Sequence, residues 1–147
     1  MTKISLKIVT PERVVYEDVV DSVTTMTESG EITVLPNHVP LVTNLRSGEI
    51  RLKKDKEEIF LAASTGFLEV RSGREVVILA DTAERAEELE LEKIEEAKER
   101  ARQALTDVRH TDDVSFANAA AALERELARH KVALKRKHRT MIAPKSE

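Results

Sequence analysis

The 147-residue sequence contains no cysteine and no tryptophan, and its aromatic side chains are three Phe and one Tyr. Without cysteine there is no disulfide framework and no thiol chemistry, and a zinc site is disfavoured. The four histidines are scattered without metal-site spacing: His38, His110, His130 and His138. The four glycines stand singly, whereas a phosphate-cradling loop needs several between a strand and a helix. We therefore expect no catalytic centre, no metal and no required cofactor.

Long apolar runs are also missing. No stretch approaches the roughly 18 apolar residues that span a bilayer, and the N-terminus lacks the apolar run of a signal peptide. We expect no direct membrane insertion. The basic run 135–139 contains no aromatic residue, so it lacks the stacking surface on which nucleic-acid bases lie, and we expect no nucleic-acid partner.

Residue type and charge divide the chain near residue 81. Most of the Val, Thr and Gly precede this point, and Ala, Glu, Lys, Arg and Leu dominate after it. Residues 84–108 carry nine acids against five bases, while 114–143 carry two acids against seven bases. Opposite charge favours pairing of these two segments, and the basic surplus of the second also suits an acidic partner.

The first part of the chain has the pattern of short strands. Residues 4–10 alternate Ile4, Leu6 and Ile8 with residues facing the other side, which is typical of a half-buried strand. Further strands are predicted at 14–16, 19–26, 32–35, 41–45, 49–53, 58–63, 67–70 and 76–80. Asn37 tolerates positive φ, which predicts a tight turn there. Nine or ten strands at this spacing predict a sandwich or flattened barrel.

The last third of the chain has two helical patterns separated by a polar break at 109–113. Apolar and small residues recur at steps of three and four, first at Leu91, Ile94, Lys98, Ala101, Leu105 and Val108, then at Phe116, Ala120, Leu123, Leu127, His130 and Leu134. We expect the first helix to begin at Glu84, capped by Asp81 and Thr82, and these two rows to form the seam between the helices.

The predicted fold is therefore α+β: an N-terminal β-sandwich of about ten short strands followed by a C-terminal antiparallel two-helix hairpin. We assign 1–82 to the sandwich, 83–140 to the hairpin and 141–147 to a frayed tail. The apolar seam is small for the number of residues it must order, so we expect the hairpin to dock on the sandwich or on a partner and to exchange between them. One hypothesis is a free-standing sandwich adaptor whose hairpin forms a coiled coil with an acidic protein.

Several short strings, taken in order, resemble the epsilon subunit of the F-type ATP synthase over nearly the whole chain. They are Val9-Thr10-Pro11 with Val15-Tyr16, the run 29–42 (SGEITVLPNHVPLV), Ser47-Gly48-Glu49-Ile50-Arg51, Gly66-Phe67-Leu68-Glu69-Val70, and the run 77–85 (VILADTAER). The sequence departs from the family at Thr33, Asn37 and Thr65, where the family usually has Gly.

The resemblance implies a non-catalytic rotor subunit, peripheral at the cytoplasmic face of the bacterial cell membrane. The sandwich would bind the gamma subunit and the membrane proteolipid ring, and couple ring rotation to ATP synthesis. Ring-facing positions match Glu28, Ser29, Gly30, Glu31 and His38, although ordinary turn chemistry also explains these residues. The basic second helix would inhibit ATP hydrolysis by contacting acidic loops of the beta subunits, beside the alpha subunits, through Arg125, Arg129, Lys131, Lys135 and Arg136.

Some bacterial members of this family bind ATP on the folded hairpin as a regulatory ligand. The matching positions here are Glu84, Glu90, Lys93, Arg100, Arg125 and Arg129. Glu90 replaces the usual Asp, Lys93 the usual Arg, and Ile94 the usual Ala; lysine lacks the planar fork of arginine. If Leu123 and Leu127 face the first helix, the two arginines point away from it, and a solvated or beta-facing stripe is the alternative to nucleotide binding.

Overall fold

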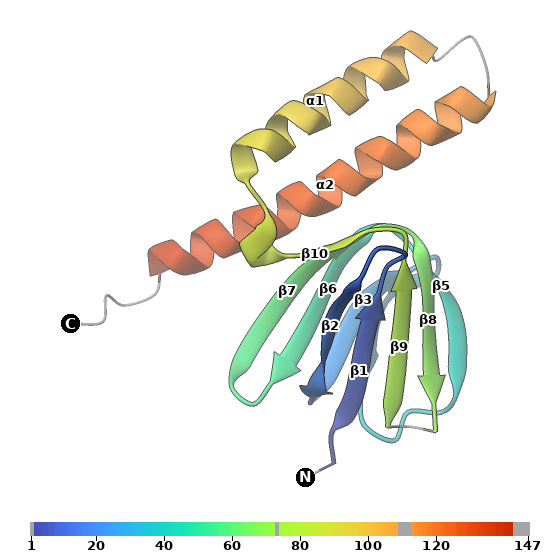
Figure 1. Ribbon diagram of the computed structural model, residues 1–147, viewed down its shortest axis with the longest axis vertical. Coiled ribbons are helices and arrows are strands. Elements are labelled where there is room, and N and C mark those ends of the chain that lie inside the picture. Colours follow the sequence, from blue (N-terminus) through green and yellow to red (C-terminus); the bar gives the residue numbers. More distant parts are fainter. Residues whose placement is uncertain (1, 73, 109–112, 143–147) are drawn as a thin grey trace.

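The computed structural model describes residues 2–72, 74–108 and 113–142 (Figure 1). Residues 109–112 of the predicted polar break (109–113), Gly73 and the end of the predicted tail, 143–147, lie outside the described residues. The described chain forms a β-sandwich followed by two antiparallel helices that project from one end of it (Figure 1). The predicted fold class is confirmed.

The described residues contain ten strands. They are β1 (Ile4–Val9), β2 (Val14–Val20), β3 (Ser22–Thr27), β4 (Gly30–Val34), β5 (Leu41–Leu45), β6 (Gly48–Lys54), β7 (Glu57–Ala63), β8 (Gly66–Arg71), β9 (Glu75–Ala80) and β10 (Ala83–Arg85). Their order is β10-β7-β6-β3-β5-β8-β9-β1-β2, with β4 on β3. All pairs are antiparallel except β1 with β9, which is parallel.

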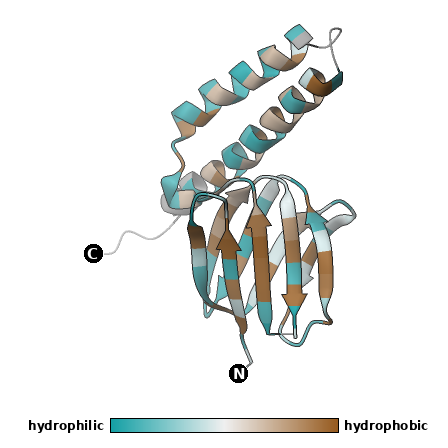
Figure 2. Ribbon diagram, turned by 45° about the vertical axis from the view of Figure 1, so that its right-hand side comes forward, coloured by the Kyte–Doolittle hydropathy of each residue, from teal (hydrophilic) through white to brown (hydrophobic). Residues whose placement is uncertain are grey.

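One apolar core fills the sandwich because alternate residues of nearly every strand point inward. Ile4, Leu6 and Ile8 of β1 have no exposed surface, as the period-two pattern predicts. They pack in the same cluster as Leu52 and Leu61 from the opposite layer. Figure 2 shows the hydrophobic colour concentrated in the strands, whereas the helices are mostly hydrophilic.

Two local expectations about the strands have different outcomes. Asn37 has φ of 68°, so the predicted tight turn is confirmed. The predicted break between strands 14–16 and 19–26 is wrong, since β2 runs unbroken to Val20 and the chain turns at Asp21 instead. The reason is pairing: residues 16–20 continue the ladder against β1, while Glu17 and Asp18 project into solvent.

The first helix begins later than expected. Instead of a helix from Glu84, residues Ala83–Arg85 form β10 on β7, and a 3-10 turn, η1 (Ala86–Glu88), follows. Ala83 and Ala86 are buried at 4% exposure, so this segment completes the sheet before the chain leaves it. Helix α1 spans Leu91–Val108, where the apolar periodicity itself begins.

Helix α2 (Asp113–Ile142) runs back antiparallel to α1 and lies over β6, β7 and η1 (Figure 1). The predicted seam is wrong in part for this helix: Phe116, Leu127 and Leu134 are 41%, 43% and 43% exposed, whereas His130 lies 3.6 Å from Glu95 of α1. Small residues are buried instead, because they allow α2 to pack closely against both the sandwich and α1. Val132 has no exposed surface and packs with Ala62 and Ala86 in a second apolar cluster.

Gly66 marks a close approach between β8 and β9. A Cβ added there would lie 1.9 Å from the carbonyl oxygen of Leu79. We expect Gly66→Ala to lower the free energy of unfolding by about 1–3 kcal/mol, because one strand must shift. Chemical denaturation measures this change. The control Lys7→Ala, exposed on β1, should stay within about 0.5 kcal/mol, and equal stability of the two variants would contradict the close approach.

Candidate functional site

A pocket of about 330 Å³ opens where β10, η1, α1 and α2 meet. Five of the six positions matched to nucleotide binding line it: Glu84, Glu90, Lys93, Arg100 and Arg129. The sixth, Arg125, lies beside it, with its Nε 3.8 Å from Oε1 of Glu126 in the pocket wall. Residues separated by up to 45 positions in sequence are therefore brought together at one end of the sandwich.

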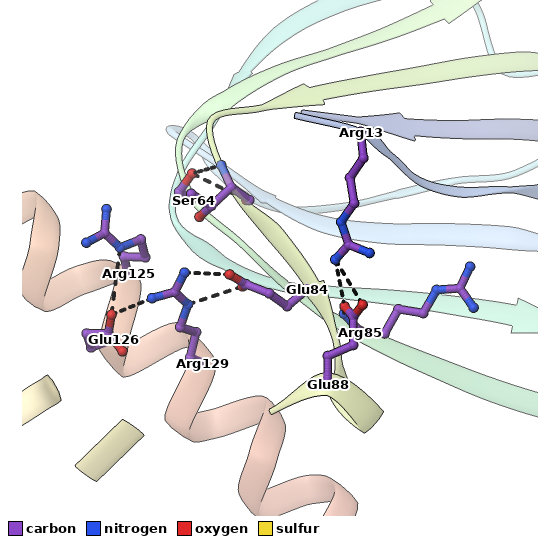
Figure 3. Close-up of polar contacts among 9 residues, drawn as sticks. Arg13, Ser64, Glu84, Arg85, Glu88, Arg125, Glu126 and Arg129 are labelled. Carbon is purple, nitrogen blue, oxygen red and sulfur yellow. Dashed lines mark hydrogen bonds and ion pairs between the residues drawn. The ribbon is translucent and has the colours of Figure 1, made fainter. Parts of the chain in front are cut away.

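Arg129 is the centre of this arrangement (Figure 3). Its Nε donates to Oε2 of Glu84 at 3.1 Å, and a terminal nitrogen donates to Oε1 of Glu84 at 2.5 Å. The other terminal nitrogen donates to Oε1 of Glu126, also at 2.5 Å. Burial lowers the pKa of Arg129, but the hydrogen bonds and charge of Glu84 and Glu126 outweigh burial and raise it above its ordinary value.

The arginines are expected to point away from the first helix only if Leu123 and Leu127 face it, and Leu127 does not meet that condition. Leu127 is 43% exposed and does not lie in the seam. The helix is instead turned so that Arg129 and Glu126 line the same pocket as Lys93 and Arg100 of α1. The rotation follows from burying Val132 and Ala128 rather than the larger leucines.

The segment that carries Glu84 and Glu88 is held against β2 and against Arg13, the residue before β2. Nε and a terminal nitrogen of Arg85 both donate to the carbonyl of Val15, at 3.1 and 3.0 Å. Glu88 pairs with Arg13 at 2.9 Å. Burial raises the pKa of Glu88, but the Arg85 N–H and Arg13 outweigh it and lower that pKa. These contacts therefore hold in place the segment of β10 that carries Glu84.

Two other cations of α2 are also bound by the sandwich. Lys135 Nζ donates to Oε1 of Glu49 at 2.7 Å and lies 5.1 Å from the centre of the Phe60 ring. Arg136 donates to the carbonyls of Ala86 and Glu87 at 3.2 and 3.0 Å. Four of the five residues predicted to contact beta subunits thus have partners within the chain: Arg125, Arg129, Lys135 and Arg136.

Lys131 differs from those cations. It is exposed and lines a second pocket of about 250 Å³, between α2 and the strands, which also contains Glu31 and Arg46. The cations predicted to contact beta subunits therefore do not share one face of α2: the others are paired within the chain, whereas Lys131 lies at the exposed edge of the helix.

The predicted ring-facing residues lie at the two ends of β4. Glu28 and Ser29 are exposed in the β3–β4 turn, where Gly30 has φ of 120° and its carbonyl accepts from the Thr27 hydroxyl at 2.7 Å. Glu31 begins the outward side of β4. His38 follows the end of this strand, so β4, about 15 Å long, separates the two parts.

Sequence reasoning missed two features. The first is Glu126, a carboxylate with 6% exposure. The second is an exposed apolar row, Val42, Phe67 and Leu79 (69%, 55% and 51% exposed), on β5, β8 and β9. Phe67 pairs directly with Leu79. The signal was present, because these residues occupy outward positions in strands whose other residues already fill the core.

Two further findings concern metals and membranes. Within residues 2–72, 74–108 and 113–142 no group of three His, Asp or Glu side chains is placed to hold a metal ion. Over the same ranges, neither helix combines the length and hydropathy that crossing a bilayer requires.

Comparison with known sequences gives a consistent result. Residues 3–86 match the family model described as the beta-sandwich domain of the ATP synthase delta/epsilon chain. The ATP synthase epsilon chain of Dehalococcoides mccartyi is 44% identical over 142 residues, which covers 97% of this chain and 100% of the relative. That of Herpetosiphon aurantiacus is 43% identical, covering 92% of this chain and 98% of the relative.

Two solved structures share the fold. A chain in the Euglena gracilis mitochondrial ATP synthase (OSCP/F1/c-ring) has a TM-score of 0.74 at 24% identity, covering 94% of this chain and 82% of that chain. A chain in the Tetrahymena thermophila mitochondrial ATP synthase (central stalk/c-ring) has a TM-score of 0.63 at 12% identity, covering 90% and 97%. The likeness extends through both sandwich and helices.

We expect Arg129→Ala to weaken the docking of α2. Two partly buried carboxylates lose their shared cation, so the free energy of opening α2 should fall by about 1–3 kcal/mol. Amide exchange of residues 126–136 measures that opening. The matched control is Arg102→Ala, because Arg102 is 55% exposed and pairs with Glu99 within α1. The control should change opening by less than about 0.5 kcal/mol, and equal effects of the two changes would count against the role of Arg129.

Proposed function

The chain belongs to the family of ATP synthase epsilon chains, and on that premise we propose that it is a non-catalytic rotor subunit of the F-type ATP synthase. In this proposal the sandwich couples rotation of the membrane proteolipid ring to ATP synthesis, and the hairpin inhibits ATP hydrolysis. The subunit sits peripherally at the cytoplasmic face of the bacterial cell membrane. Family membership argues against the free-standing adaptor.

The exposed apolar row of Val42, Phe67 and Leu79 supports a docking face for the gamma subunit. Large apolar side chains on neighbouring strands are unusual on the surface of a monomer and are typical of an interface. The loop 35–40 offers a second exposed apolar group, Leu35 and Val39 at 57% and 71% exposure, next to His38. We assign this loop and the turn containing Glu28 and Glu31 to contact with the ring.

The observation that supports inhibition best is the bonding of the cations on α2. Arg129 and Lys135 are held by the carboxylates of Glu84 and Glu49 in the docked hairpin. Acidic loops of a beta subunit offer the same chemistry, so leaving the sandwich exchanges one set of ion pairs for another. The docked and extended forms then differ little in free energy, and the assembly selects between them.

A second candidate function is a response to ATP. Five of the six matched residues converge on one pocket between the two helices and the sandwich. A ligand that bridges α1, α2 and β10 binds only the docked hairpin and therefore favours it. ATP acts here as a regulatory ligand and not as a substrate.

We expect removal of residues 90–147 to raise the ATP hydrolysis rate of the assembled head several-fold, because the inhibitory helices are gone. The cut leaves β10 and η1 in place, since both pack on the sheet. Hydrolysis by complexes reconstituted with the full or the shortened chain measures the effect. An unchanged rate would mean that this hairpin is not an inhibitor.

We expect Phe67→Glu to weaken binding to the gamma subunit about tenfold or more, since loss of a central apolar anchor costs on the order of 2 kcal/mol. Co-purification and a binding titration with gamma measure this change. The control Lys56→Glu lies at the exposed β6–β7 tip and should bind gamma normally. Normal binding by both variants would place the gamma interface elsewhere.

A further inference from the structure

Glu126 is the only charged residue that is buried in the part of the chain the structure describes. Burying a carboxylate this deeply costs free energy of desolvation unless the carboxylate is well paired. Its Oε1 accepts from Arg129 at 2.5 Å and lies 3.8 Å from Nε of Arg125. The side chain of Glu126 is 8% exposed and forms part of the pocket wall. Figure 3 shows it between Arg125 and Arg129.

Glu126 is not the only partner of Arg129 in the docked hairpin. Arg129 already has a two-pronged partner in Glu84, whose two oxygens accept from two of its nitrogens. Glu126 adds a second anion to the same guanidinium. Nε of Arg125 is buried and has no hydrogen-bond partner, but it lies within ion-pair distance of Glu126, which therefore lies beside two arginines at once. Two guanidinium groups around one anion are also the arrangement that binds a phosphate.

We propose that the Glu126 carboxylate is a built-in substitute for a nucleotide phosphate. It sits between Arg125 and Arg129, holds the hairpin closed without any ligand, and excludes nucleotide until it is displaced. This inference rests on the second candidate function and specifies its regulation: Glu126 sets how much nucleotide the hairpin needs before it responds.

The charge and size of the pocket support this assignment. Four carboxylates line it, Glu84, Glu88, Glu90 and Glu126, against three cations, Lys93, Arg100 and Arg129. A polyanion entering this pocket meets an Arg129 that two carboxylates already neutralise and a Lys93 that is paired with Glu90. Ile94, buried at 6% exposure, takes up part of the space, and about 330 Å³ is near the lower limit for ligand pockets.

Calorimetry with ATP on the full chain tests the proposal. The wild-type chain should bind ATP no tighter than millimolar, while E126A and E126Q should each bind at least about tenfold tighter, since a charged competitor for the arginines is removed. E126Q keeps the shape of the side chain and guards against misfolding of E126A. The control E124A, an exposed position on the same helix, should bind as the wild type does.

Closure of the hairpin gives an independent readout. Because the chain has no cysteine, cysteines introduced at Glu57 and Ala121 allow specific labelling for energy transfer. The wild-type hairpin should stay closed with or without ATP. E126Q should be less closed without ATP and should close when ATP is added.

The proposal is overturned if both Glu126 variants bind ATP as weakly as the wild type, or if the wild type itself binds tightly. Closure of E126Q that is independent of ATP would also contradict it. These results leave the rotor function untouched, because that function is tested by gamma binding and by hydrolysis in the assembled head, neither of which depends on Glu126.

Discussion

The contact of one face of α2 with β7 and η1 holds the helical hairpin on the sandwich. Val132 is fully buried there against Ala62 and Ala86, and Arg129 and Lys135 bind carboxylates on either side of it. Helix α1 packs chiefly on α2. If α2 leaves the sandwich, α1 has little to hold it, so the hairpin docks or departs as a unit.

This contact is suited to reversal. Its apolar part is built from valine and alanine, which bury little surface, and partly exposed ion pairs typically contribute no more than about 1 kcal/mol each. The cations that bind the sandwich are the ones available to an acidic partner. Meanwhile the larger apolar residues Phe116, Leu127 and Leu134 remain exposed. The docked state therefore leaves both charge and apolar surface for another set of contacts, while the ten-stranded core is unaffected.

The sandwich was predictable from sequence because strand alternation and turn residues are local signals: Ile4, Leu6 and Ile8 are buried as their spacing indicates. The rotation of α2 about its own axis is not determined by local sequence signals. The large leucines of α2 predicted one seam, but contact with the sandwich selected Ala128 and Val132 instead. The start of α1 was missed for a similar reason, since Ala83 and Ala86 favour a helix by composition and pairing with β7 overrides that preference. The pocket residues were found through family resemblance, whereas the burial of Glu126 depends on that rotation and could not be read from spacing.

If the proposed inhibition is right, a hairpin docked on its own sandwich cannot inhibit the assembled head. A reducible bifunctional thiol crosslinker between cysteines introduced at Ser47 and Glu124, which line one pocket between the sandwich and α2 in the docked state, tests it directly. ATP hydrolysis by the reconstituted complex should run at the uninhibited rate while the crosslink is intact and should fall when it is reduced. Hydrolysis that stays inhibited with the hairpin crosslinked to the sandwich would contradict the account.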